Sequence, residues 1–115
     1  MYDKTIFTQS TAIKRFIYAL EQNLFIEAHE LLEEDWKGYK KKGEKDKAKA
    51  LKGLINGATA LALYFIKNRP DGYQKVWLVF EKYKPLLDIV KLEEIEKFHE
   101  AKNLLIKINE KVVIK

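Results

Sequence analysis

Apolar residues recur every three or four positions along most of the chain, which is the spacing of an amphipathic helix. The first such stretch places Ile13, Phe16, Ile17 and Leu20 on one helical face. The same spacing predicts further helices at about residues 24–42, 46–68, 73–84 and 91–109. No stretch alternates apolar and polar residues for long enough to predict a sheet. The pattern therefore predicts an all-α fold, a single helical domain over residues 1–115 with about five helical segments.

Helix-breaking residues lie between these segments. Asn23 tolerates the left-handed backbone that ends helices, and Gly43 ends the second predicted helix. The stretch "NRPDG" at residues 68–72 predicts a turn, because proline and glycine do not continue a helix easily. Pro85 breaks the fourth predicted helix for the same reason.

The longest uncharged apolar run is "GATALALYFI" at residues 57–66. This run has about half the length that spans a bilayer, so we expect a buried helix and no membrane partner. A helix that is apolar on all sides lies at the centre of its bundle. Residues 54–66 are therefore predicted to be the least exposed part of the chain.

The stretch "EAHELLEEDW" at residues 27–36 has the most distinctive polar pattern. On one continuous helix, His29 and Glu33 lie four residues apart at the edge of the apolar face, beside Trp36. At this spacing a neutral imidazole and a carboxylate can share one metal ion or one proton. Asp35 falls inside the apolar face, where an acid needs a partner. The sequence thus predicts one polar site on this helix.

The stretch "NLFIEAHELLEEDWK", followed by "LKGLINGATALALYFIKNRPDG", resembles the uncharacterised bacterial and archaeal family called domain of unknown function 309. The family signature is a histidine, three residues, a glutamate, two residues and a tryptophan, which His29, Glu33 and Trp36 match without a gap. A second family block is similar to residues 53–56 and the alanine-rich stretch after them. The resemblance extends over about residues 16–90. It implies a small helical bundle of unassigned activity, with the signature residues at a metal or functional site.

The chain departs from this family pattern at two places. Asn56 stands where many members have glutamine, and the second histidine that members often carry late in that helix is absent. His29 and Glu33 then supply two ligands for a divalent metal ion, whereas a catalytic zinc site has three protein ligands. The only other histidine is His99, which follows Glu96 at the spacing found in di-iron helical bundles.

The polar site has two interpretations at this point. In the first, His29, Glu33, Trp36 and Asn56 bind a small ligand or a divalent metal ion, with enzymatic activity undecided. In the second, the same residues form a structural cluster in which the Trp36 indole donates to an acceptor such as Asn56. The serines and threonines form no nucleophile elbow or triad, and no glycine-rich phosphate loop is present. The sequence therefore predicts a binding site without naming a reaction.

Lysine dominates the net charge of +5. Residues 37–52 contain eight lysines against two acids, Glu44 and Asp46. A basic segment of this kind either meets nucleic acid or another anionic partner, or forms a solvated loop between helices. The loop interpretation is favoured, because the segment lacks the interleaved aromatics and arginines that bind bases. Nucleic-acid binding through this segment is the alternative to a small ligand.

Two further expectations concern location and assembly. The amino terminus "MYDKTIFTQS" lacks an apolar signal core and contains Asp3, which predicts a cytoplasmic protein. The absence of cysteine excludes disulfides, thiolate metal sites and thiol catalysis. A last alternative is a structural protein that forms a homodimer through exposed apolar residues such as Ile26, Tyr73 and Trp77.

Overall fold

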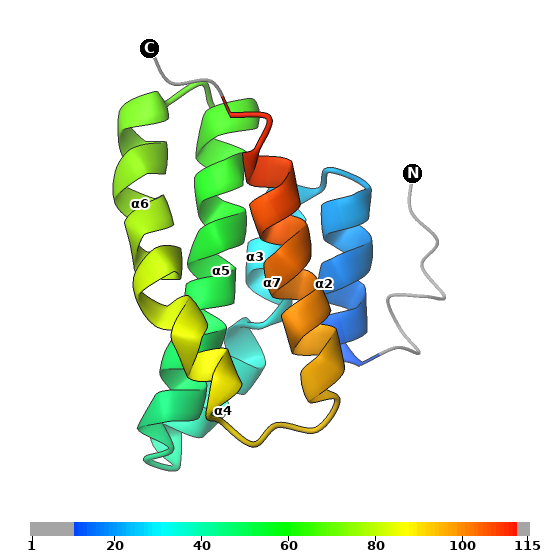
Figure 1. Cartoon of the computed structure of the whole chain (residues 1–115), viewed down its shortest axis with the longest axis vertical. Coiled ribbons are helices and arrows are strands. Elements are labelled where there is room, and N and C mark those ends of the chain that lie inside the picture. The colour runs from blue at the N-terminus through cyan, green and yellow to red at the C-terminus, as the bar shows by residue number, and fades with distance from the viewer. Residues whose placement is uncertain (1–10, 113–115) are drawn as a thin grey trace.

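The computed structural model describes residues 11–112, which form a bundle of helices (Figure 1). In chain order the elements are α2 Ala12–Glu21, α3 Phe25–Leu31, α4 Glu33–Lys41, α5 Lys45–Phe65, α6 Pro70–Tyr83, the 3-10 helix η1 Lys84–Asp88 and α7 Ile95–Asn109. No strand occurs in this part of the chain, and the predicted all-α fold is confirmed. The amino-terminal stretch on which the localisation prediction depends lies outside the described residues.

Helix α5 lies in the middle of the bundle, with α6 on one side and α2 and α7 on the other (Figure 1). It packs against α3, α4, α6, η1 and α7. Small side chains such as Ala50, Ala58 and Ala60 are fully buried along it, so its neighbours approach closely. The central position agrees with the prediction from its apolar composition. Within residues 11–112, no helix is long and apolar enough to cross a membrane.

The last turn of α5 is more exposed than its composition predicts. Burial continues as far as Ala62, but Phe65 and Ile66 are 39% and 48% exposed. Their side chains border an open hollow of about 320 Å³, and the Phe65 ring stacks on Phe25 of α3 with the ring centres 5.9 Å apart. The prediction that residues 54–66 are the least exposed is therefore wrong for this turn.

Residues with a left-handed backbone mark several helix boundaries. Asn23 has a φ of 60° and Gly43 a φ of 79°, and each follows a helix end, as predicted. Glu94 has a φ of 59° and directly precedes α7. A left-handed residue cannot belong to a right-handed helix, so α7 begins at Ile95 and not near residue 91.

Two other predicted boundaries are wrong. The helix predicted over residues 24–42 is divided at Leu32, where φ is −101° and ψ is −3°. The break separates α3 from α4, so the faces predicted for one continuous helix do not hold after Leu32. Asp35, which was predicted to lie in the apolar face, is exposed. Helix α6 begins at Pro70 and not at Tyr73, since proline suits the first helical position, where its missing N–H needs no partner.

The residues predicted to form a dimer surface are largely buried. Tyr73 and Trp77 are only 6% and 8% exposed, and Ile26 packs against the core. Among residues 11–112, the large apolar side chains that are most exposed are Leu78 and Ile89, each at 67%. Burial removes Tyr73 and Trp77 from any exposed contact surface, and a homodimer stays a prediction without an assigned surface.

Two glycines let α6 and α7 rest on the backbone of α5. A Cβ atom at Gly57 would lie 2.9 Å from Cδ1 of Leu105 and 3.1 Å from Cδ1 of Phe80. A Cβ atom at Gly53 would lie 3.0 Å from Cβ of Tyr83. These separations are shorter than ordinary carbon contacts of about 3.5–4.0 Å. Close packing around α5 therefore depends on the missing side chains.

We expect Gly57→Ala to lower the free energy of unfolding by about 1–3 kcal/mol, because buried Leu105 and Phe80 must move. Gly38→Ala in α4 is the matched control, since nothing lies within 4 Å of the added methyl group. There we expect a gain of about 0.5–1 kcal/mol from the higher helix propensity of alanine. Urea denaturation measures both changes. A gain in both variants would contradict the close contact at Gly57.

Candidate functional site

His29 and Glu33 lie on opposite sides of a helix break. His29 is near the end of α3, and Glu33 is the first residue of α4. Nε2 of His29 lies 3.6 Å from Oε1 of Glu33. The two side chains are 30% and 34% exposed, so the pair is accessible to solvent and to small ions. The structure therefore brings together the first two signature residues.

The second ring nitrogen of His29 is held by the backbone. Nδ1 forms a hydrogen bond with the carbonyl oxygen of Ile26. A carbonyl oxygen only accepts, so Nδ1 carries the hydrogen and Nε2 faces the Glu33 carboxylate. The 3.6 Å separation is longer than a direct hydrogen bond of about 2.7–3.2 Å. A proton or a metal cation on Nε2 would make this approach favourable.

The residues around this pair do not complete a metal site. Over residues 11–112, no group of three or more histidine, aspartate or glutamate side chains is placed to hold a metal ion. The other histidine, His99, has its Nε2 4.0 Å from Oδ1 of Asp88. A catalytic zinc site uses three protein ligands, so His29 and Glu33 fit only part of one.

Asn56 makes a local hydrogen bond. Its Nδ2 donates to the carbonyl oxygen of Lys52, four residues earlier in α5, at 2.8 Å. This bond uses one of the two amide N–H donors. The ammonium groups of Lys40 and Lys52 lie beside the Trp36 ring. Asn56 as a ligand-binding residue stays a prediction.

A cavity of about 290 Å³ opens beside Trp36 and is called the Trp36 cavity below. Its lining residues are Trp36, Lys40, Gly43, Lys45, Ala48, Lys49, Lys52 and Tyr83. Nζ of Lys40 lies 4.9 Å from the centre of the Trp36 ring, and Nζ of Lys52 lies 6.0 Å from it. Both distances allow a cation–π interaction, which extends to about 6 Å. The cavity thus combines positive charge with aromatic surface, and no acidic residue lines it.

One row of residues on α5 forms much of the cavity wall. Lys45, Lys49 and Lys52 follow one another at spacings of four and three, and Asn56 continues the row after another four. Residues at these spacings share one face of a helix. The row faces α4, because α4 packs against α5 and the Lys52 side chain approaches the Trp36 ring between the two helices. Lys45, Lys49 and Lys52 were not predicted as site residues from the sequence, although their spacing along the chain could have identified them.

The lysine-rich segment 37–52 is not a loop. Helices α4 and α5 include all of it except residues 42–44. Aromatic rings stand among its lysines, since Nζ of Lys47 lies 5.5 Å from the ring centre of Tyr39 and Trp36 is one turn away. Burial raises the pKa of Tyr39 above its ordinary value. The loop interpretation, and the absence of interleaved aromatics on which it depended, are wrong.

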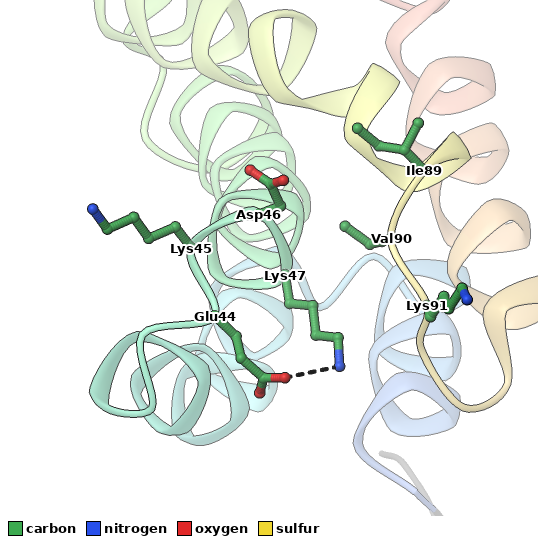
Figure 2. Close-up of a pocket in the computed structure, with 7 residues that line it drawn as sticks. All are labelled: Glu44, Lys45, Asp46, Lys47, Ile89, Val90 and Lys91. Carbon is green, nitrogen blue, oxygen red and sulfur yellow. Dashed lines mark hydrogen bonds and ion pairs between the residues drawn. The ribbon is translucent and has the colours of Figure 1, made fainter.

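Another hollow, of about 430 Å³, lies between the start of α5 and the residues after η1 (Figure 2). It is lined by Glu44, Lys45, Asp46, Lys47, Ile89, Val90 and Lys91. Nζ of Lys47 and Oε1 of Glu44 form an ion pair at 3.1 Å, and Lys45 points away from Ile89 and Val90 (Figure 2). This hollow therefore has both acidic and basic side chains, and its lysines do not point to one place. It is less suited to an anion than the Trp36 cavity.

Comparison with known proteins identifies a family. A family model for a domain of unknown function (DUF309) matches residues 13–76, more than half of the chain. The matched span includes His29, Glu33, Trp36 and the α5 wall of the Trp36 cavity. Neither the curated proteins nor the solved structures give a significant match. The chain therefore belongs to the DUF309 family, a domain of unknown function.

Proposed function

We propose that the chain binds a small organic anion in the Trp36 cavity. The observation that carries this proposal is the lining, which contains four lysines and no acidic residue. Ammonium groups around a hollow without a compensating carboxylate create a positive potential that attracts an anion. The proposal assigns binding and no reaction.

The size and the aromatic walls of the cavity favour an organic anion over a simple inorganic ion. A volume of about 290 Å³ is close to the lower end of small-molecule pockets, which is about 300 Å³. Half-buried Trp36 and Tyr83 supply ring surface on its walls. A ligand with an anionic group and a ring or other apolar part would use both kinds of wall.

The signature residues have different roles in this proposal. Trp36 contacts the ligand, and Asn56 extends the lysine row by one helical turn. His29 and Glu33 act as positioning residues, because their contact bridges the break before α4. Glu33 lies one turn before Trp36, and the Trp36 backbone N–H donates to the carbonyl oxygen of Leu32 at 3.0 Å. The orientation of α4 thus determines where the indole stands.

Titration calorimetry with phenyl phosphate and phenol tests the proposal. We expect one phenyl phosphate to bind per chain at about 0.02 M salt, and binding to weaken strongly at about 0.2 M salt because charges are screened. Phenol has the same ring without the charge and should give no measurable heat. If neither compound binds, or if both bind equally, the proposed anion site is wrong.

A divalent metal at His29 and Glu33 is a second candidate function. The specific observation is that Nδ1 donates to the backbone, which leaves Nε2 facing Oε1 at 3.6 Å. Two ligands of one tetrahedral zinc ion lie about 3.4 Å apart, so the separation suits a shared ion. With only two protein ligands, we expect weak binding in which solvent supplies the remaining positions.

Zinc titration of the untagged chain tests this candidate. We expect His29→Ala and Glu33→Gln each to remove the binding, since each removes one of two ligands. His99→Ala is the matched control, because it removes the only other histidine and should leave zinc affinity unchanged. Zinc binding that survives both of the first two substitutions would exclude the pair as the metal site.

Two broader predictions remain proposals. Nucleic-acid binding through residues 37–52 is supported by the lysines and aromatics that α4 and α5 bring together. A cytoplasmic location is the second of these proposals. Fractionation of cells that express the full chain would test the location.

A further inference from the structure

We infer that the organic anion is a nucleotide, with its base on the Trp36 ring and its phosphate among the cavity lysines. This inference rests on the proposed function, and it adds the chemical class of the ligand. Three features of the Trp36 cavity carry it. They are the half-buried Trp36 ring, the four lysines of the lining, two of which lie over that ring, and the volume of the cavity.

The indole of Trp36 offers a surface for a planar base. The residue is half-buried, and the ammonium groups of Lys40 and Lys52 lie 4.9 Å and 6.0 Å from the ring centre. These lysines have long flexible side chains, so a base can take their place on the ring while they turn toward a phosphate. Stacking on an aromatic ring tolerates every base, since each base has a π face.

Lys45 and Lys49 add positive charge to the α5 wall of the cavity, where the inference places the phosphate. Both line the cavity from the first turns of α5, together with the Lys52 side chain. Lysine ammonium groups are point charges with freely rotating donors, which suit a phosphate and lack the two-pronged geometry of arginine. A phosphate monoester carries a charge of about −1.5 to −2 at neutral pH. The four lysines therefore match a phosphate better than a single carboxylate.

The volume of the cavity favours one free nucleotide over a nucleic-acid strand. About 290 Å³ is at the lower end for a ligand pocket, which is the size of one small molecule. Binding a strand requires a groove in which successive bases meet successive rings. Tyr39, the next ring on α4, is outside the cavity lining and lies beside Lys47. We therefore commit to a mononucleotide.

Titration calorimetry with adenosine monophosphate, ribose 5-phosphate and adenosine at about 0.02 M salt tests this inference. We expect adenosine monophosphate to bind at least about tenfold tighter than ribose 5-phosphate, because only the former stacks a base. Adenosine, which lacks the charge, should bind more weakly than either. Trp36→Leu should abolish the tenfold preference, so that adenosine monophosphate and ribose 5-phosphate bind this variant with equal affinity. Trp36→Phe keeps a ring and should retain most of the preference, with circular dichroism confirming that both variants fold.

The outcomes distinguish a failure of the nucleotide inference from a failure of the proposed anion site. Equal affinities for adenosine monophosphate and ribose 5-phosphate would overturn the nucleotide and leave the anion site standing. Binding of none of the three compounds, together with no binding of phenyl phosphate, would overturn both. An eight-residue oligodeoxyadenylate that binds more than about tenfold tighter than adenosine monophosphate would also overturn the mononucleotide, in favour of a strand.

Discussion

Replacing Phe80 by alanine is expected to lower the free energy of unfolding by about 3–5 kcal/mol. The Phe80 side chain on α6 is fully buried, and its ring centre lies 4.6 Å from that of Trp77. The same ring sits over Gly57, where α6 packs closely on α5. Removing the ring leaves a cavity at this contact, because the α5 backbone cannot move in to fill it. Urea denaturation followed by circular dichroism measures the change.

Leu78→Ala is the matched control for this prediction. Leu78 belongs to the same helix but is 67% exposed, so truncation removes little buried surface. We expect a change within about 0.5 kcal/mol. Equal losses at Phe80 and Leu78 would contradict an α6 that buries Phe80 and exposes Leu78.

The second large effect concerns the charge of the Trp36 cavity. The double substitution Lys45→Glu with Lys49→Glu should weaken phenyl phosphate binding by about 100-fold or more. Hydrogen bonds to a charged group contribute about 1.5–3 kcal/mol each, and the variant replaces two of them with repulsion. Both side chains project from α5 into the cavity lining, and neither is needed for the core. Titration calorimetry at about 0.02 M salt measures the loss.

Lys41→Glu with Lys42→Glu is the control with the same change of net charge. These two lysines belong to the same basic segment but do not line the Trp36 cavity. At the same salt concentration of about 0.02 M screening is weak, so this variant should also lose some affinity, but clearly less than the Lys45 and Lys49 variant, because neither side chain lines the cavity. Equal losses in the two double variants would point to a diffuse basic surface instead of a cavity.

The helices could be predicted because their information is local. The spacing of Ile13, Phe16, Ile17 and Leu20 identifies α2 without any knowledge of its neighbours. Asn23 predicts the end of this helix, because asparagine is one of the few residues that adopt the left-handed backbone conformation easily. Propensity does not predict the break at Leu32, since leucine is a strong helix former and its side chain is fully buried there.

The candidate site could be predicted only in part, because its walls come from different helices. The spacing of His29 and Glu33 survives the break, and the two side chains face each other. The contact of Trp36 with Asn56 stays a prediction, and the lysines that approach the Trp36 ring come from both α4 and α5. Tyr83 joins the cavity from the end of α6, a contact that no local pattern indicates.

The two tryptophans of the chain allow the central proposal to be tested in one titration. Their indole N–H groups give separate signals in a ¹⁵N–¹H correlation spectrum. Trp36 lines the cavity, whereas Trp77 is buried and its Nε1 donates to Oε1 of Glu81 at 3.0 Å. On addition of phenyl phosphate, we expect the Trp36 signal to shift and saturate while the Trp77 signal stays in place. A saturating shift of the Trp77 signal alone, or no shift of either signal, would contradict an anion site at Trp36.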